Sequence, residues 1–195
     1  MNPAHFFTFL RICISPLFPI IYLGYERLGI SIASMPYLLL ALLFVSEFSD
    51  VFDGFLARKR NQVTELGKVL DPMADTITHI SLFLAFTQGF VRLPLLLVLV
   101  FLYREFFIST LRTLCALRGV ALAARPSGKI KAIMQAVVAF IIVVLMIPYL
   151  AGHLSQELFQ LINLIALSIA AIYTVLSAVD YCYSNRLTIK KAVHR

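Results

Sequence analysis

Four aspartates stand at fixed spacings within a short stretch of the chain that is flanked by apolar sequence. Asp50 and Asp53 lie three residues apart, and Asp71 and Asp75 lie four residues apart. Each pair therefore falls on one face of its segment if that segment is helical. Four like charges brought together would repel one another strongly unless cations intervene. Because carboxylate oxygens favour hard ions, the pattern predicts a site for Mg²⁺ or Mn²⁺, which also bind phosphate oxygens.

The composition of the chain indicates a membrane protein. Of its 195 residues, 61% are hydrophobic and only 14% are charged, and the mean hydropathy is +0.90. A soluble domain of this length would be much more polar. The net charge is +7, but the basic residues lie between apolar blocks. This distribution favours lipid headgroups and phosphorylated substrates as partners and argues against nucleic acid. Aspartates in such a chain are costly and predict a functional site.

Six apolar segments are long enough, or nearly so, for a spanning helix of about 20 residues. We therefore expect an all-α integral membrane protein with six transmembrane helices in one domain, residues 1–195. Residues 2–10 are expected to form a short helix in the membrane interface. A cleaved signal peptide is the alternative for this N-terminus, but no basic region precedes the apolar stretch. The six segments cover residues 11–25, 36–56, 72–90, 94–117, 130–150 and 158–183.

The positions of lysine and arginine predict the orientation in the membrane. If the N- and C-termini are cytoplasmic, fifteen of the seventeen basic residues fall on the inner side, and only Arg27 and Arg92 fall outside. This bias follows the positive-inside rule. It places the four aspartates at the cytoplasmic ends of the second and third helices. Pro36, Pro72 and Pro94 fall at segment starts, where the missing N–H group costs least.

The aspartates are part of a longer pattern, D-x2-D-G-x2-A-R-x8-G-x3-D-x3-D, over residues 50–75. With this pattern the chain resembles the CDP-alcohol phosphatidyltransferase family, and the likeness covers essentially the whole chain. The resemblance implies that a CDP-linked lipid binds and that the acidic residues hold two divalent cations, Mg²⁺ or Mn²⁺. It also implies that an alcohol attacks the β-phosphorus to release CMP, and that the protein is a homodimer.

The resemblance also implies roles for individual residues. Asp50, Asp53 and Asp71 would be the principal metal ligands, while Asp75 would lie at the metals and act as the catalytic base. Such an arrangement suits two-metal phosphoryl transfer with general-base catalysis. An internal salt-bridge network is the alternative, but it would not need two glycines. The CDP-lipid would be bound by Asp50, Gly54, Ala57, Arg58 and Gly67.

Four basic residues further along the chain are expected to bind the acceptor alcohol. Arg104 and Arg112 stand eight residues apart, close to one helical face, and Lys129 and Lys131 follow. Together they would form an anion site for an acceptor that carries its own phosphate, such as sn-glycerol 3-phosphate. This stretch resembles bacterial family members that use glycerol 3-phosphate with CDP-diacylglycerol. We therefore expect a bacterial plasma-membrane enzyme whose site faces the cytoplasm. Positive-inside anchoring is the alternative role for these residues.

Two features depart from that branch and leave the acceptor open. Thr76 stands where a lysine is common, and the N-terminus reads Pro3-Ala4-His5. Phosphatidylglycerol, as in a cardiolipin synthase, and inositol or inositol phosphate are the alternative acceptors. His79, one turn after Asp75, is expected either to hydrogen-bond Asp75 or simply to pack. Outside the family, an ion-coupled transporter is the alternative, but transporters usually place their sites near the midplane between internal repeats.

Overall fold

The computed structural model is helical throughout the elements that it describes. It covers residues 3–59, 65–119, 122 and 125–193, and for residues 3–7, 50–59, 65–69, 71 and 191–193 it describes the backbone alone. The expected all-α class is therefore confirmed for this part of the chain. In chain order the helices are α1 (Pro3–Ile14), α2 (Leu17–Gly24), α3 (Met35–Lys59), α4 (Glu65–Phe86), α5 (Leu95–Leu117), α6 (Pro126–Leu150), α7 (Gln156–Ser184) and α8 (Arg186–Val193).

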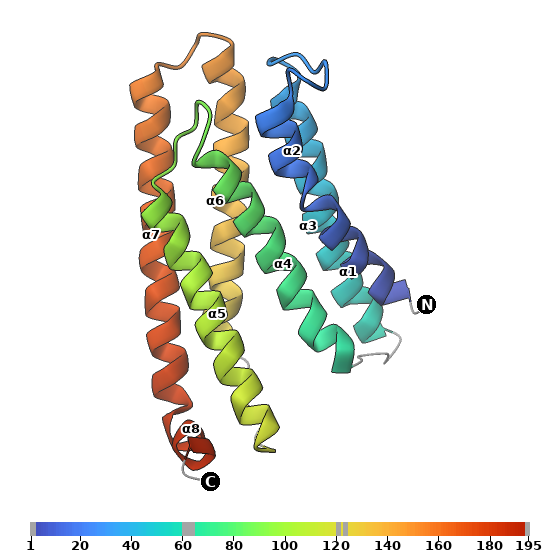
Figure 1. Ribbon diagram of the computed structural model, residues 1–195, viewed down its shortest axis with the longest axis vertical. Helices are drawn as coiled ribbons and strands as arrows, with labels where there is room; N and C mark the ends of the chain where they lie inside the picture. The colour runs from blue at the N-terminus through green and yellow to red at the C-terminus, as the bar shows by residue number, and fades with distance from the viewer. Residues whose placement is uncertain (1–2, 60–64, 120–121, 123–124, 194–195) are drawn as a thin grey trace.

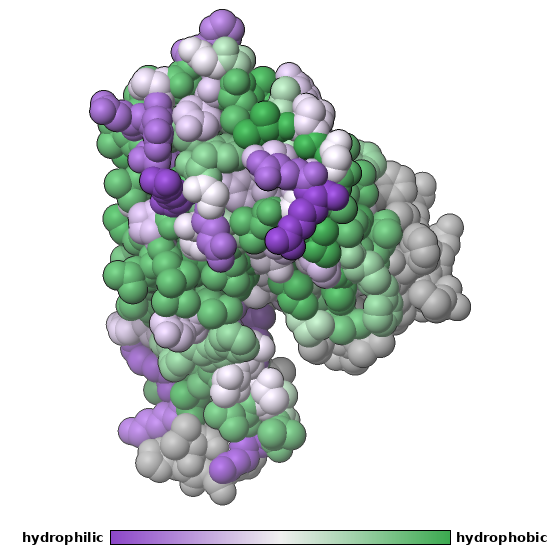
Figure 2. All heavy atoms as spheres, turned by 45° about the horizontal axis from the view of Figure 1, so that its top comes forward, coloured by the Kyte–Doolittle hydropathy of each residue, from purple (hydrophilic) through white to green (hydrophobic). Residues whose placement is uncertain are grey.

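Four of the six predicted segments coincide closely with helices, namely α3, α5, α6 and α7. Among the described residues, α6 and α7 are the two helices that are long and apolar enough to cross a membrane. Helix α5 has a similar length but carries Arg104, Glu105 and Arg112 along it. Figure 2 shows apolar residues over much of the visible surface. Many large apolar side chains are exposed, among them Leu96 at 77% and Leu117 at 79%. Such a surface is consistent with a membrane protein.

The structure differs from the sequence prediction at two prolines. The first apolar segment is not one helix, because α1 ends at Ile14 and α2 begins at Leu17. Pro16, between them, lacks the N–H group that would continue the hydrogen-bond ladder. The prediction that Pro72 starts a segment is also wrong, since Pro72 lies inside α4, which begins at Glu65. A helix can extend through polar residues beyond its apolar stretch, and composition does not reveal that extension.

Helix α4 runs between two groups of helices in Figure 1, with α1–α3 on one side and α5–α7 on the other. Helix α1 packs against both α3 and α4. The C-terminal ends of α3, α5 and α7 and the N-terminal ends of α4 and α6 lie toward the lower end of the bundle in this view. These are the ends that the distribution of basic residues assigns to the cytoplasm, and the aspartate pattern lies there.

The turn between α4 and α5 is fixed by one buried tyrosine. The Tyr22 hydroxyl donates to the carbonyl of Gln88 at 3.0 Å and accepts from the N–H of Val91 at 3.2 Å. Gly89, between them, has a φ of +67°, and a Cβ there would lie 2.7 Å from the Tyr22 hydroxyl. Glycine is therefore required at this position by both backbone conformation and space. The contact sets where α5 starts, and so where its charged residues lie relative to α4.

Candidate functional site

Asp75, the predicted catalytic base, lies on α4 and is paired with an arginine from α1. Nη1 of Arg11 donates a hydrogen bond to Oδ1 of Asp75. The Arg11 side chain is 1% exposed, whereas that of Asp75 is 32% exposed. Burying a guanidinium requires compensation by an anion or by hydrogen bonds, and Asp75 supplies part of it. Helix α1 therefore contributes a charged residue to the predicted catalytic region.

A second polar contact joins the residue that directly follows α1 to α4. Ser15 Oγ and Thr78 Oγ1 lie 2.8 Å apart, and both residues are buried. From the sequence alone, Arg11 counts only as one of the basic residues on the inner side. The signal that could have identified it is the polar stripe of Thr8, Arg11 and Ser15, which recurs at helical spacing in an otherwise apolar segment.

Replacing Arg11 by methionine is expected to destabilise the protein. The substitution keeps a long side chain but removes a charged hydrogen bond to Asp75, which is typically worth about 1.5–3 kcal/mol. The apparent Tm of purified protein in detergent should fall by several degrees. Arg27→Met is the matched control, because Arg27 is exposed, and it should leave the Tm unchanged. An unchanged Tm in Arg11→Met would contradict a stabilising role for the ion pair.

Two of the four predicted acceptor-binding residues meet at a glutamate on α5. Nη1 of Arg104 lies 2.8 Å from Oε1 of Glu105, and Nζ of Lys131 donates to the same oxygen. Oγ1 of Thr76 lies 3.4 Å from Oε2 of Glu105. Arg104 and Lys131 are both buried. Glu105, which the sequence did not mark as a site residue, therefore joins α4, α5 and α6 at one point.

This Glu105 junction, formed by Thr76, Arg104, Glu105 and Lys131, lies beside the predicted base. Thr76 directly follows Asp75 in α4, and its hydroxyl is in contact with Oε2 of Glu105. Figure 2 shows a hollow between two lobes at the lower end of the molecule. The structure thus brings the predicted base and two predicted anion-binding cations into one region.

The other two predicted acceptor residues lie away from the Glu105 junction. Nε of Arg112 donates to the Tyr181 hydroxyl at 3.1 Å, and the guanidinium carbon lies 5.1 Å from the centre of that ring. Eight residues of helix place Arg112 about 12 Å along the axis from Arg104. Lys129 is exposed in the first turn of α6. Arg112 and Lys129 are therefore nearer the lower end of the bundle than Arg104 and Lys131.

The start of α6, which carries Lys131, is fixed to α7 by one aspartate. Asp180 accepts from Nη2 of Arg125 at 3.1 Å and from Oγ of Ser127 at 2.6 Å. These contacts hold the residues on either side of Pro126, where α6 begins. They fix the position of α6 along the bundle, and so the place where Lys131, one to two turns further along, contacts Glu105.

His79 links α4 to α3 close to the aspartate pattern. Its Nε2 lies 2.9 Å from Oε1 of Glu47, one turn before Asp50. The histidine is 4% exposed. Of the two roles expected for His79, it makes a hydrogen bond, but its partner is Glu47 rather than Asp75. It thus connects the two helices that carry the four aspartates.

The other predicted site residues lie outside the side chains that the structure describes. The backbone places those on α3 in its last three turns and those on α4 in its first two turns. Within the described residues, no group of three acidic, histidine or cysteine side chains could hold a metal ion. Because three of the four predicted carboxylate ligands are not in that set, the metal site stays a prediction. The predicted site residues whose side chains are not described are Asp50, Asp53, Gly54, Ala57, Arg58, Gly67 and Asp71.

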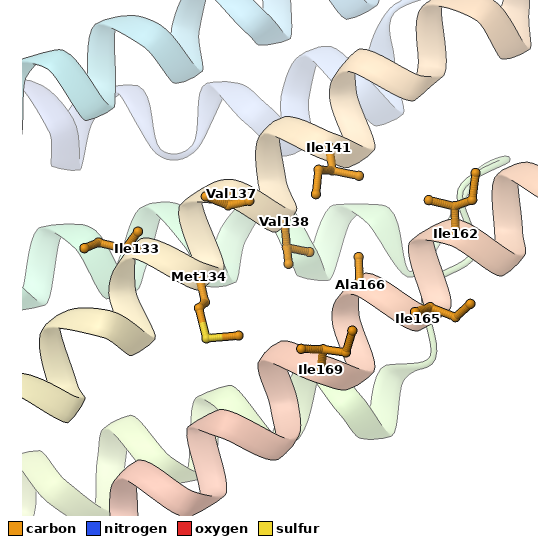
Figure 3. Close-up of a pocket in the computed structure, with 9 residues that line it drawn as sticks. All are labelled: Ile133, Met134, Val137, Val138, Ile141, Ile162, Ile165, Ala166 and Ile169. Carbon is orange, nitrogen blue, oxygen red and sulfur yellow. The ribbon is translucent and has the colours of Figure 1, made fainter.

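A groove of about 530 Å³ lies between α6 and α7, lined by five side chains between Ile133 and Ile141 of α6 and by four between Ile162 and Ile169 of α7. Its lining consists of isoleucine, valine, alanine and methionine side chains, and Met134 projects from α6 into the space facing Ile169 of α7 (Figure 3). It contains no charged or hydrogen-bonding side chain that could bind a phosphate. The polar region around Asp75 and the Glu105 junction is therefore the candidate site.

Comparisons with known proteins agree with the resemblance in the aspartate pattern. The sequence profile of the CDP-alcohol phosphatidyltransferase family matches residues 1–178. A protein of Bacillus subtilis (strain 168) named CDP-diacylglycerol–glycerol-3-phosphate 3-phosphatidyltransferase is 33% identical in an alignment of 193 residues that covers 94% of this chain and 94% of its own. Proteins of the same name from Rickettsia typhi and Treponema pallidum are 36% and 33% identical, over 69% and 67% of this chain and 71% and 63% of their own.

Proposed function

The chain belongs to the CDP-alcohol phosphatidyltransferase family, and from that membership we propose the reaction that it catalyses. It transfers a phosphatidyl group from CDP-diacylglycerol to sn-glycerol 3-phosphate, which yields phosphatidylglycerophosphate and CMP. The names of the relatives that match over most of both chains support these substrates. The described residues add an independent argument for a phosphorylated acceptor.

The observation that carries the choice of acceptor is the charge balance at the Glu105 junction. Arg104 and Lys131 bring two positive charges, and Glu105 supplies one negative charge. Nε of Arg104 is buried without a hydrogen-bond partner, and Lys131 has further ammonium hydrogens to donate. An excess of positive charge with unused donors is complementary to a phosphate group. A neutral alcohol such as inositol would leave this charge uncompensated.

In the proposed reaction, Asp75 takes the proton of the acceptor hydroxyl. The hydroxyl oxygen of the acceptor forms a bond to the β-phosphorus of the CDP-lipid. The bond from that phosphorus to the bridging oxygen breaks, and CMP leaves. Arg11 orients the Asp75 carboxylate through Oδ1. The proposed ligands Asp50, Asp53, Asp71 and Asp75 offer only carboxylate oxygens, a donor set that fits Mg²⁺ or Mn²⁺. Two such ions would neutralise the pyrophosphate of the CDP-lipid.

The same proposal includes an arrangement in the membrane. Six segments span the bilayer, both termini are cytoplasmic, and the site opens at the cytoplasmic face of a bacterial plasma membrane. The apolar length of α6 and α7 supports spanning, and the excess of basic residues at one side supports the orientation. Residues 1–195 form a single domain. The enzyme acts as a homodimer, as expected from the family.

A panel of acceptors tests the substrate assignment. Purified protein in detergent receives CDP-diacylglycerol and one of four alcohols, and CMP release is measured. Glycerol 3-phosphate should be used far better than glycerol, inositol or phosphatidylglycerol. Equal rates with glycerol or inositol would rule out a phosphate-binding site. A preference for phosphatidylglycerol would instead identify a cardiolipin synthase.

Arg104→Lys is expected to raise the KM for glycerol 3-phosphate by about tenfold or more, because lysine cannot reproduce the forked donors of a guanidinium. The KM for CDP-diacylglycerol should change little, since the lipid nucleotide is held by other residues. Arg27→Lys, at an exposed position, is the matched control. Arg112→Lys should have the same kind of effect if Arg112 also contacts the phosphate. An equal rise in both KM values for Arg104→Lys would contradict the assignment.

A further inference from the structure

Glu105 is the one residue at the junction that contacts all three of its neighbours. Its Oε1 accepts from Arg104 of the same helix and from Lys131 of α6, while its Oε2 lies 3.4 Å from the hydroxyl of Thr76 on α4. Its side chain is 19% exposed, and those of Arg104 and Lys131 are 8% and 6% exposed. A carboxylate in this position determines how closely the two buried cations approach each other.

Without Glu105, the two cations would repel one another in surroundings of low dielectric constant. Each would be expected to move apart or toward water, because long basic side chains adapt readily. With Glu105 present, both are held against a single oxygen atom, Oε1. The glutamate therefore lowers the cost of holding two positive charges together while leaving one net positive charge.

Thr76 connects this pair of cations to the proposed base. Because Thr76 directly follows Asp75, its contact with Oε2 links Glu105 to the part of α4 that carries Asp75. In an acceptor with a phosphate at one end and a reacting hydroxyl at the other, the distance between the two groups is limited by the bonds that join them. The junction is thus suited to set the distance between the phosphate-binding cations and the base.

We propose that Glu105 is the positioning residue of the acceptor site. It holds Arg104 and Lys131 together, at a set distance from Asp75, so that they can bind the phosphate of the acceptor. The proposal rests on the proposed function, because it requires glycerol 3-phosphate as the acceptor. Glu105 does not bind the phosphate itself, since two anions would repel. Its effect is exerted through Lys131 and Arg104.

Glu105→Gln should raise the KM for glycerol 3-phosphate by about 10- to 100-fold, as expected from the loss of charged hydrogen bonds. The KM for CDP-diacylglycerol should stay within about twofold, on the same energy scale. Glu105→Asp, which keeps the charge, should recover part of the loss. Glu157→Gln is the matched control, because Glu157 is exposed in the first turn of α7, and it should leave both KM values unchanged.

A double-mutant cycle distinguishes positioning from a general structural role. In a Lys131→Met background, Glu105→Gln should have less effect on the KM for glycerol 3-phosphate, because one of the two residues through which it acts is gone. Additive effects on both KM values, together with a falling Tm, would overturn the proposal. A lower KM in Glu105→Gln would also overturn it, since it would mean that Glu105 competes with the phosphate.

Thr76→Val provides a second test if Glu105→Gln does not fold. It removes the hydroxyl next to Oε2 with little change in shape, and should raise the KM for glycerol 3-phosphate by a few fold, in line with one weak hydrogen bond. No change in that KM would count against the link to Asp75. Failure of the proposed function would be visible separately, because wild-type protein would then not use glycerol 3-phosphate in the acceptor panel.

Discussion

Asp50→Asn, Asp53→Asn and Asp71→Asn are each expected to abolish nearly all CMP release while the protein still inserts and purifies. Each change keeps the size of the side chain but removes a negative charge that a hard divalent ion requires. Two-metal phosphoryl transfer depends on both ions for charge neutralisation, so losing one ligand should have a large effect. Turnover of purified protein with saturating CDP-diacylglycerol and glycerol 3-phosphate is the measurement.

Metal removal gives the corresponding test on the unaltered protein. Chelation with EDTA should abolish CMP release, and added Mg²⁺ or Mn²⁺ should restore it. Glu157→Gln, which removes an exposed carboxylate on α7, should retain full activity and the same metal dependence. Undiminished turnover in any of the three aspartate variants would remove that residue from the ligand set. Activity that survives chelation would contradict the metal site as a whole.

Asp75→Asn is expected to lower turnover by about 10²–10⁴-fold, which is the usual contribution of a positioned general base. Asparagine has nearly the same shape but cannot take the proton of the acceptor hydroxyl. Binding of CDP-diacylglycerol should be weakened much less, because that substrate is held mainly by other residues. If the affinity for the lipid nucleotide falls in step with turnover, Asp75 is chiefly a metal ligand and its assignment as the base is wrong.

The contact between Asp75 and Arg11 calls for a stability control on this variant. Asp75→Asn removes the charge that Arg11 faces, so part of any loss could come from a destabilised fold. The double variant Arg11→Met/Asp75→Asn removes both charges and should recover some of the Tm. It should not recover turnover. Recovery of turnover together with Tm would show that Asp75 acts through the stability of the α1–α4 contact.

The fold was most predictable where apolar length alone decides the element. The bounds of α5, α6 and α7 agree with the predicted segments to within a few residues, because about 20 apolar residues in sequence leave few alternatives to a helix. Prediction failed where a helix continues past its apolar part, as α4 does before Pro72. It failed again where one apolar segment is divided, as at Pro16. In both cases the hydrogen bonds of the backbone decide the boundary, and hydropathy does not report them.

The site was predictable only for relations within one helix. The spacing of Asp71 and Asp75 indicates a common face because the helical period is fixed. In contrast, the burial of Arg11 against Asp75 depends on how α1 packs between α3 and α4, and no local pattern states that packing. The contact of His79 with Glu47 is likewise a relation between helices.

By itself, the sequence determined the family, through the aspartate pattern and the whole-chain likeness, and it determined the helical class through apolar length. Only the tertiary structure decided which of the four predicted cations belong together. It placed Arg104 and Lys131 on one oxygen of Glu105 and directed Arg112 to Tyr181. The physical reason is that positions along one helix are set by its fixed rise and turn, whereas the register between helices is set by side-chain packing across them. Which residue of α6 or α7 a side chain on α5 contacts is therefore decided by packing between residues that are far apart in the sequence.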